Sequence, residues 1–455
     1  MGSPGAPSIQ GSFLWPDDPG WDQARGAWNL AVEQRPAAVA LAQGAGDVAA
    51  VIAFASANGL RVAAQGTGHG AGTLGELHDT VLIKTERMRG IELDRQRAIA
   101  RIEAGVLAAE LGAAAQQAGL CALPGSSPDV GVVGFTLGGG LGWLGRRYGF
   151  ACNRVRAIEL VGADGEPRTI DAEHEPELFW ALRGGGGGFA IVTALQIELV
   201  AVAEVYAGTL ILPAEVGVEA IRRYRDWAAG VDRDVTSIVR FLRLPPLPEI
   251  PEPIRDRPLL TIGAACIADR ERGERLIAPL RELGEPIMDS FGQIPGEGLS
   301  RIHMDPEHPV PGIGDHALIA ELPDQAIEAF AGAVGPQAGS ALLLGELRQL
   351  GGALGEAGER AGALDKLDGA FLLSAIGSPA SPETGETIEA DLARVHGAMQ
   401  PWEAPGGYLN FAERPCDLDA ILPAEVCHRL REVKHRWDPH GLIRSNHSLA
   451  IGPAA

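Results

Sequence analysis

The chain has 455 residues, an apolar fraction of 46% and a formal net charge of −21 at pH 7. This length suits two or three packed domains, and the composition excludes a disordered protein. So acidic a chain argues against nucleic acid or an anionic membrane as a partner held by a general basic surface.

Glycine is over-represented, with 61 residues in clusters that have no triplet period, which excludes collagen. Such clusters indicate backbone in unusual conformations or in close contact with a ligand. The five cysteines are scattered and form no CxxC pair, so neither a disulfide framework nor a structural zinc site is expected. No membrane span or signal peptide is visible, and a cytoplasmic location is the expectation.

The first half of the chain alternates helix and strand signals. Asp47 is the expected N-cap of an amphipathic helix over 48–57, and Asn58-Gly59 offers a left-handed exit. Asp164-Gly165 predicts a β-hairpin. Strands are expected over 61–65, 80–84, 98–103, 158–163, 168–171 and 189–200, and an alanine-rich helix over 106–118.

From about residue 200 the pattern changes, because proline-rich stretches separate strand signals from helix signals. A strand is expected over 259–268 and a helix over 271–283, which together indicate a second domain. Pro423 opens a last helix, which stops before Asp438-Pro439. Its apolar stripe is Val426, Leu430, Val433 and Trp437.

Four glycine clusters are candidate ligand loops: 65–72, 124–142, 184–188 and Gly406-Gly407. Backbone amides without side chains can converge on phosphate oxygens, so a diphosphate is the expected guest. The loop from Gly66 to Ala71 is close to GxGxx[G/A], but no convincing helix follows it. No GK[ST] follows any loop either, so neither a Rossmann site nor a P-loop is expected.

In order and spacing, these motifs resemble the berberine bridge enzyme-like oxidases of the vanillyl-alcohol oxidase/PCMH-type FAD-binding superfamily. The resemblance covers nearly the whole chain. It rests on VAAQGTGH at 62–69, GVVGFTLGGGLG at 131–142, RRYG at 146–149, LFWALRGGGGG at 178–188, ELRQLGG at 346–352, YLNF at 408–411, WDP at 437–439 and SNHS at 445–448.

The resemblance implies an α+β, two-domain PCMH-type FAD-binding fold. Residues 1–205 are then expected to form the FAD-binding domain. Residues 206–405 would form an α+β substrate domain, an antiparallel sheet covered by helices. Residues 406–455 would be a berberine-bridge-like segment that returns to the FAD domain and covers the isoalloxazine.

The resemblance also implies FAD bonded covalently through its 8α-methyl to His69, whose neutral imidazole is a competent nucleophile. Many relatives carry a second bond from a cysteine at the position of Ser127, and serine forms no thioether, so a single bond is expected. The other implied cofactor-binding residues are Gly66, Thr67, Gly68, Gly70, Ala71, Ser127, Val130, Gly131, Gly134, Phe135, Gly138, Gly139, Gly142, Tyr148, Gly188, Val192 and Asn446.

For catalysis the resemblance implies that Tyr408, in a Tyr-x-Asn segment with Asn410, removes the substrate proton. The alternative for Tyr408 is a buried aromatic with a satisfied hydroxyl. Phe411 replaces a second tyrosine of relatives. Val130 matches the position that controls oxygen approach, and its small side chain favours an oxidase.

The remaining candidates are one charged pair and four histidines. Arg348 and Glu346 could face substrate or form an inter-strand ion pair. His303 and His308 are expected in loops. His428 and His435 share a helix face without carboxylates at ligand spacing, so no metal site is expected.

The sequence thus predicts an FAD-linked oxidase that moves hydride from a small molecule to flavin N5, with O2 as acceptor and H2O2 as product. The substrate would be an alcohol, a sugar hydroxyl or a natural-product intermediate. Two alternatives are a dehydrogenase of the same fold that uses another acceptor, and a flavin-binding protein that carries a ligand without catalysis.

Overall fold

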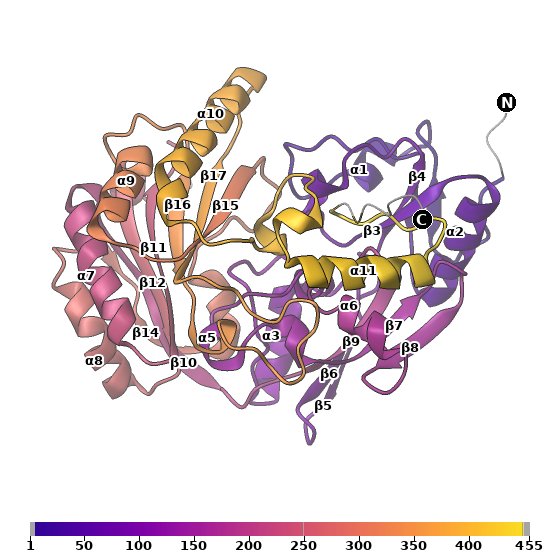
Figure 1. Cartoon of the computed structure of the whole chain (residues 1–455), viewed down its shortest axis with the longest axis horizontal. Helices are drawn as coiled ribbons and strands as arrows, with labels where there is room; N and C mark the ends of the chain where they lie inside the picture. The colour runs from indigo at the N-terminus through magenta and orange to yellow at the C-terminus, as the bar shows by residue number, and fades with distance from the viewer. Residues whose placement is uncertain (1–4, 249, 448, 450–455) are drawn as a thin grey trace.

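Three β-sheets organise the computed structural model, which describes residues 5–248, 250–447 and 449 (Figure 1). Two sheets come from residues before 200, and the third, of eight strands, comes from residues after it. The chain therefore has the mixed α+β architecture that the sequence predicted.

The first sheet has the strand order β1-β2-β4-β3. Strands β2, β4 and β3 run parallel to one another, and β1 pairs with β2 in the antiparallel sense. Helix α2 covers the sheet by packing Val48, Val51 and Ile52 against its buried valines and alanines. The elements here are β1 (Ser12–Leu14), α1 (Trp21–Arg25), β2 (Ala38–Leu41), α2 (Ala45–Ala57), β3 (Arg61–Gln65) and β4 (Thr80–Lys84).

The predicted N-cap at Asp47 was wrong. Helix α2 begins at Ala45 with Gly44 at its N-cap, so Asp47 lies in the first turn. Its carboxylate accepts hydrogen bonds from the backbone N–H groups of Gln10, Gly11 and Gln43. Since the N-terminal segment occupies this carboxylate, Asp47 ties that segment to the helix.

The second sheet is antiparallel throughout, in the order β5-β6-β9-β7-β8. The hairpin at Asp164-Gly165 is confirmed, since β7 and β8 pair around it and Gly165 has a φ of 80°. The elements are β5 (Ile91–Asp94), β6 (Ile99–Glu103), α3 (Ala108–Gln117), α4 (Val132–Leu137), α5 (Gly145–Tyr148), β7 (Val155–Val161), β8 (Pro167–Asp171), α6 (Pro176–Ala181) and β9 (Ile191–Glu198).

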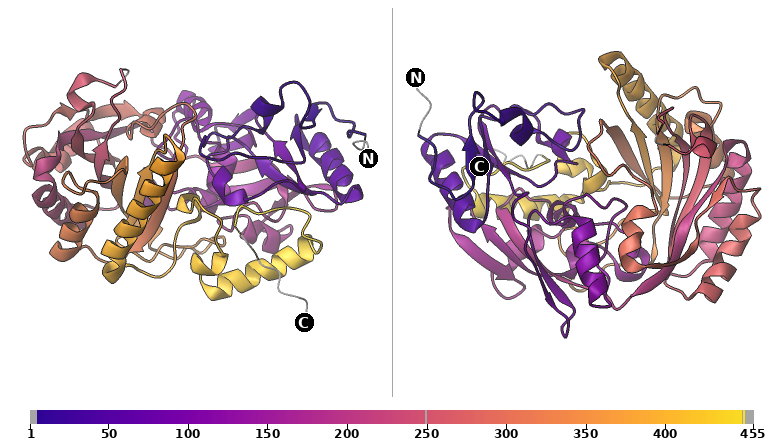
Figure 2. Two further views of the ribbon diagram at one scale, coloured as in Figure 1. Left: turned by 90° about the horizontal axis from the view of Figure 1, so that it is seen from above. Right: turned by 180° about the vertical axis from the view of Figure 1, so that it is seen from behind.

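The third sheet, also antiparallel, runs β13-β10-β12-β11-β16-β17-β15, and β14 pairs with β10. Helices α7 to α10 cover one face, and the other face turns toward the first half of the chain (Figures 1 and 2). The elements are β10 (Glu204–Pro213), α7 (Gly217–Gly230), β11 (Val235–Arg243), β12 (Pro258–Cys266), α8 (Arg270–Arg281), β13 (Met288–Asp289), β14 (Gly292–Pro295), β15 (Ile313–Ile319), α9 (Asp324–Val334), β16 (Leu344–Gln349), β17 (Phe371–Gly377) and α10 (Pro382–Met399).

The C-terminal segment returns to the first half through α11 (Ala424–Trp437), drawn in yellow in Figure 1. As predicted, Leu430 and Val433 of the apolar stripe are buried in the core of the second sheet. The chain then runs beside β3, where Val62 donates a backbone hydrogen bond to Leu442 and accepts one from Arg444. Ser448, the last residue of the SNHS motif, lies outside the described residues.

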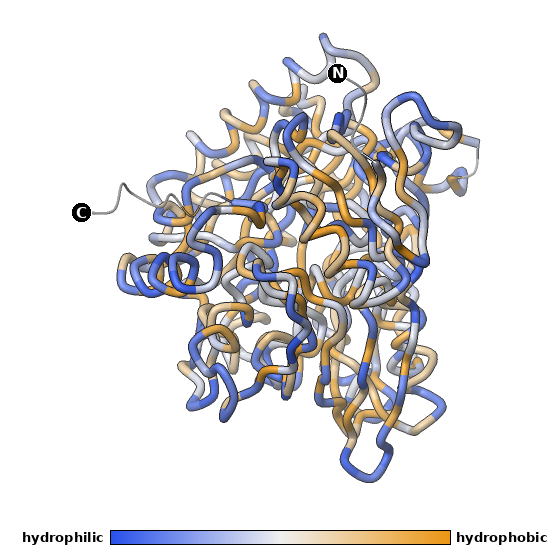
Figure 3. The backbone as a smooth tube through the Cα atoms, turned by 90° about the vertical axis from the view of Figure 1, so that its right-hand side faces the viewer, coloured by the Kyte–Doolittle hydropathy of each residue, from blue (hydrophilic) through white to orange (hydrophobic). Residues whose placement is uncertain are grey.

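Apolar residues concentrate inside the molecule and polar ones at its outer turns, as the hydropathy colouring of Figure 3 shows. Within the described residues, no helix combines the length and apolarity needed to cross a membrane.

Candidate active site

A cavity of about 1050 Å³ lies between the glycine-rich loops of the first half and the face of the third sheet opposite helices α7 to α10. One wall comes from residues 64–74 and 122–138. The opposite wall comes from strands β11, β16 and β17 and from residues 303–312. The cavity thus brings together segments that are far apart in sequence, and most of its lining is apolar.

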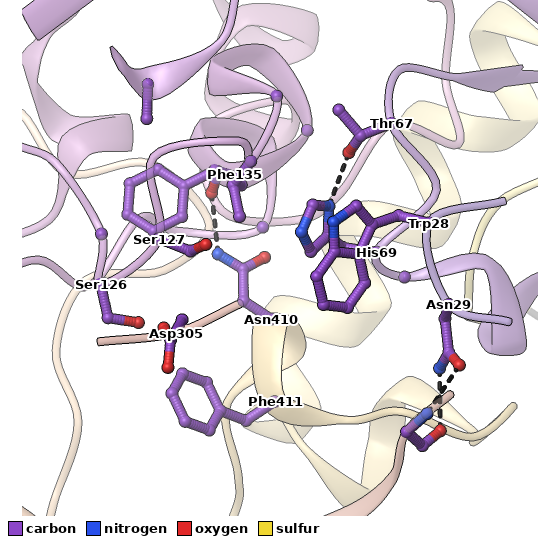
Figure 4. Close-up of a pocket in the computed structure, with 18 of the residues that line it drawn as sticks. Trp28, Asn29, Thr67, His69, Ser126, Ser127, Phe135, Asp305, Asn410 and Phe411 are labelled. Carbon is purple, nitrogen blue, oxygen red and sulfur yellow. Dashed lines mark hydrogen bonds between the residues drawn. The ribbon is translucent and has the colours of Figure 1, made fainter. Parts of the chain in front are cut away.

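His69 lies on the cavity wall, flat against the indole of Trp28, with ring centroids 4.0 Å apart (Figure 4). Its Nδ1 is 2.7 Å from the Thr67 hydroxyl oxygen. Its Nε2 is buried without a hydrogen-bond partner among the described residues. The stack and the Thr67 contact hold the ring in one orientation, with one nitrogen unsatisfied.

Asp129 organises the surroundings of His69. Its carboxylate accepts hydrogen bonds from Trp28 Nε1 at 2.5 Å and from the Ser127 hydroxyl at 2.8 Å. Asp129 Oδ1 is also 3.5 Å from His69 Nε2. Burial opposes ionisation of Asp129, but interactions with His69, Ser127 and Trp28 outweigh it and lower its pKa. An ionised carboxylate therefore lies beside the imidazole.

Most of the cofactor-binding residues predicted from the sequence line this cavity. A Cβ built on Gly134 or Gly186 would meet no atom within 4 Å, so bare backbone faces open space there. Such a wall fits an elongated ligand that contains a diphosphate, and FAD is a ligand of this kind. The predicted residues on the wall are Gly66, Thr67, Gly68, His69, Gly70, Ala71, Ser127, Val130, Gly131, Gly134, Phe135, Gly138, Val192 and Asn446.

Four of the predicted cofactor residues are not on the wall, and three of them are glycines at close backbone contacts. A Cβ on Gly139 would lie 2.8 Å from the Tyr408 ring, one on Gly142 2.1 Å from the Pro124 carbonyl oxygen, and one on Gly188 2.2 Å from Ser445. These glycines allow segments to pack rather than a ligand to approach. The fourth, Tyr148, is partly buried and packs against a cluster that includes Trp143 and, from the third sheet, Ile238.

Tyr408 also lies off the cavity wall, with 1% of its surface exposed. Its ring packs among Phe150, Cys152 and Leu364. Burial raises the pKa of the phenol, although hydrogen bonds from the Leu141 N–H and from Asn410 act in the opposite direction. In this conformation Tyr408 is a buried aromatic with a satisfied hydroxyl, and the 138–142 loop separates it from the cavity.

Asn410 does line the cavity and links two walls. Its Nδ2 donates to the Phe135 carbonyl oxygen at 2.8 Å (Figure 4). The same Nδ2 also donates to the Tyr408 hydroxyl at 3.1 Å. A Cβ on Gly138 would lie 1.8 Å from Asn410 Oδ1, so only glycine permits this approach. Phe411, which follows Asn410, also faces the cavity.

A buried charged cluster stands on the opposite wall, on strand β16. Arg348 donates from Nε and Nη2 to Glu346 Oε1 at 3.0 and 2.9 Å. Glu346 Oε2 is 2.6 Å from His303 Nε2. Glu346 and Arg348 are 2% and 6% exposed, so this is a buried ion pair within one strand, not a surface pair. Burial opposes ionisation of Glu346, but Arg348, His303 and Arg240 together lower its pKa.

His303 extends this cluster, although the sequence predicted only a loop position for it. It does lie in a turn, but it is buried and holds Asp305 Oδ1 at 2.5 Å from its Nδ1. Arg240 of β11 donates to the His303 carbonyl oxygen at 2.7 Å and to Thr261 Oγ1 at 2.9 Å. Two arginines, two carboxylates and a histidine therefore meet at one side of the cavity.

Sequence reasoning missed Trp28, Asp129, Arg240 and Asp305. Asp129 had a signal, since it stands two residues after Ser127 in a glycine cluster. Trp28, Arg240 and Asp305 had none, because they reach the site only through the packing of distant segments. Among the described residues, no group of three or more histidine, cysteine or carboxylate side chains could hold a metal ion.

Comparisons with known proteins agree with this geometry. The family described as "FAD binding domain" matches residues 36–171. The chain is 27% identical over 468 residues to (R)-6-hydroxynicotine oxidase of Paenarthrobacter nicotinovorans, spanning 97% of both chains. It is 32% identical over 221 residues to glucooligosaccharide oxidase of Sarocladium strictum, spanning 47% of this chain and 44% of that protein.

Solved structures are similar over nearly the whole chain. The crystal structure of 6-hydroxy-D-nicotine oxidase from Arthrobacter nicotinovorans superposes with a TM-score of 0.82 at 26% identity, covering 96% of this chain and 97% of that one. A chitooligosaccharide oxidase superposes with a TM-score of 0.82 at 17% identity, covering 98% of both chains. At that lower identity the second likeness concerns the fold alone.

Proposed function

The chain is an FAD-dependent oxidoreductase with a PCMH-type FAD-binding fold, and from this premise we propose that it belongs to the berberine bridge enzyme-like group and is an oxidase. Its substrate is a small molecule with an oxidisable alcohol, sugar hydroxyl or related group. The electron acceptor is O2, and the second product is H2O2.

One observation carries this proposal: a single cavity extends from His69 and the bare glycine loops to the charged cluster on β16. The first wall suits a flat cofactor with a diphosphate, and the second offers polar contacts to a substrate. Bound FAD supplies a hydride acceptor. Residues 1–205 and 406–455 are assigned to the domain that holds it, and 206–405 to the domain that faces the substrate.

His69 is proposed to carry the flavin through one covalent bond. Three features support this: the ring is fixed by Trp28 and Thr67, its Nε2 has no partner within the described part of the chain, and the ionised Asp129 can stabilise positive charge on the imidazole. Ser127, which donates its hydroxyl proton to Asp129, adds no second bond.

Tyr408 is proposed as a positioning residue rather than a proton acceptor at the substrate. Its hydroxyl fixes the loop that carries Gly138, and Asn410 joins the same loop to the cavity wall. Together these contacts hold the backbone beside the flavin and keep water from the space behind it.

The test begins with the purified protein, which we expect to be yellow and to keep its colour after acid precipitation. His69→Ala is expected to release the flavin into the supernatant, while Ser127→Ala should not. A colourless protein that takes up no FAD would contradict the proposal.

The oxidase assignment needs its own experiment. After anaerobic reduction by substrate, exposure to air should restore the oxidised flavin spectrum and yield one H2O2 per flavin. A second candidate is a dehydrogenase of the same fold. The dehydrogenase would be favoured if the flavin stayed reduced in air but regained its oxidised spectrum rapidly when an artificial quinone was added. Val130, a small side chain on the cavity wall, supports the oxidase.

A further inference from the structure

The cavity wall formed by the ends of three strands of the third sheet and by the segment 242–254 is aliphatic. Strands β11, β16 and β17 contribute Leu242, Leu344 and Ile376. Every described lining residue in the segment 242–254 is leucine, isoleucine or proline. A sugar in this space would bury hydroxyl groups beside side chains that neither donate nor accept hydrogen bonds, and each unpaired group would weaken binding.

Exposed apolar side chains mark the mouth of this region. Among the described residues, only three large apolar side chains are exposed, and two of them line the cavity: Leu247 at 45% and Met304 at 43%. The third, Leu30, is 60% exposed and is not part of the lining. Apolar surface gathered at a cavity mouth is typical of a site that takes an apolar ligand.

The charged cluster determines which kind of polar group the ligand can carry at its other end. Both carboxylate oxygens of Glu346 are already engaged, one by Arg348 and one by His303. The Nη1 group of Arg348 donates to no acceptor among the described residues, and Arg348 lines the cavity. Its guanidinium also lies over the Phe411 ring, 5.5 Å from the centroid. Arg348 Nη1 is therefore a donor of this cluster that is left without an acceptor in the described part of the chain, which suits an oxygen acceptor on the ligand rather than an ammonium group, which can only donate.

We propose that the substrate is an amphiphile, an inference that rests on the proposed function and narrows it. A hydrocarbon or aromatic body lies along the aliphatic wall, and a neutral or anionic oxygen-bearing head meets Arg348. The site selects against oligosaccharides because hydroxyls along the aliphatic wall would find no side-chain partners, and against protonated amines because an ammonium group cannot accept a hydrogen bond from Arg348 Nη1.

The test is a set of titrations of the purified, flavin-loaded protein, followed by the change in flavin absorption and by calorimetry. The probes are straight-chain carboxylates from butanoate to decanoate, the alkylammonium ions of equal length, and cellotriose. The Kd of the carboxylates is expected to fall about fourfold for each added methylene. Alkylammonium ions should bind at least about tenfold more weakly than carboxylates, and cellotriose should show no saturation.

Two variants connect these results to named side chains. Leu247→Asn should weaken decanoate binding about three- to tenfold, whereas Leu30→Asn, at a more exposed leucine outside the cavity lining, should not. Arg348→Gln should abolish the preference for carboxylate over ammonium, and Arg95→Gln on an outer turn should keep it. Because Leu247 is exposed, its variant is expected to fold normally, so the apolar part stays testable even if Arg348→Gln does not fold.

Three results would overturn the inference: a Kd independent of chain length, tight saturable binding of cellotriose, or equal effects of the two leucine variants. Each leaves the proposed function standing, provided that the protein holds FAD. A protein that takes up no FAD would instead contradict the proposed function.

Discussion

The hydroxyl oxygen of Tyr408 accepts a hydrogen bond from the backbone N–H of Leu141 at 2.7 Å, across 267 residues of sequence. Asn410 Nδ2 donates to the same oxygen at 3.1 Å. The tail of the chain thus fixes the glycine loop at 138–142 through one phenol. From this contact we expect Tyr408 to position the loop rather than to act as the catalytic base.

Tyr408→Phe removes the acceptor of a buried N–H group. We expect the free energy of unfolding to fall by about 1–3 kcal/mol and kcat to fall less than about tenfold, because the phenol does not reach the cavity. Urea denaturation and steady-state kinetics measure the two effects. A loss of about 10²–10⁴ in kcat with unchanged stability would instead support the base role.

Asp129→Ala should lower the fraction of flavin that stays attached after acid precipitation. The variant removes the carboxylate beside His69 Nε2 and leaves the Trp28 N–H and the Ser127 hydroxyl without their acceptor. Total FAD bound before precipitation serves as the control and should change little. Full covalent attachment in the variant would show that Asp129 is dispensable.

The buried pair Lys434–Asp438 is expected to hold the C-terminal segment in place. Lys434 Nζ donates to Asp438 at 2.6 Å, to the Gly188 carbonyl oxygen at 2.6 Å and to the Ile443 carbonyl oxygen at 2.7 Å. Lys434→Met leaves Asp438 charged and buried, so unfolding should become easier by about 3–5 kcal/mol.

The matched control for this pair is Lys366→Met. Lys366 pairs with Asp368 at the surface, where the two side chains are 42% and 67% exposed. Loss of such a pair should change the unfolding free energy by less than about 1 kcal/mol. Equal effects of the two variants in thermal and urea denaturation would refute the structural role of Lys434.

Val130→Leu adds a methylene to the cavity wall beside the glycine loops. If this position controls oxygen approach, reoxidation of the reduced protein by air should slow by about tenfold or more, a barrier increase of about 1.4 kcal/mol. Reduction by substrate without oxygen should keep its rate. Stopped-flow absorption separates the two half-reactions. An unchanged reoxidation rate would show that the side chain at position 130 does not control oxygen approach.

Glu413 should make stability depend on pH. Burial raises its pKa to about 7, helped by Asp315 and opposed by the Gly314 backbone and Arg414. Because this value exceeds the ordinary 4.5, the folded protein binds the proton more tightly than the unfolded chain does. The contribution is present in full below pH 4.5 and is lost as pH rises through about 7.

Glu413→Gln should therefore flatten the pH dependence. Relative to the variant, the native protein should lose about 2–3 kcal/mol of unfolding free energy between pH 4.5 and 8. Urea denaturation across this range checks the difference. Parallel curves for the two proteins would contradict the raised pKa.

The elements of the first half were largely predictable because local signals set them. The strand over 61–65 and the Asp164-Gly165 hairpin follow from short-range pattern and turn chemistry. The boundary at Asp47 was not, since its carboxylate serves backbone groups 36 and 37 residues away. Helix-capping preferences consider only residues close along the chain, so they cannot predict hydrogen bonds to Gln10 and Gly11.

By itself the sequence was enough to predict FAD, because the order and spacing of its glycine motifs resemble those of FAD-linked oxidases, and such motifs are local in sequence. Tertiary structure alone decided which glycines face the cavity and which permit packing, as Gly134 and Gly188 show. It also decided that Tyr408 is buried and that Arg240, His303 and Glu346 meet. The reason is physical: side-chain direction, burial and distance are set by how separate strands and loops pack, and one segment of sequence does not encode its neighbours in space.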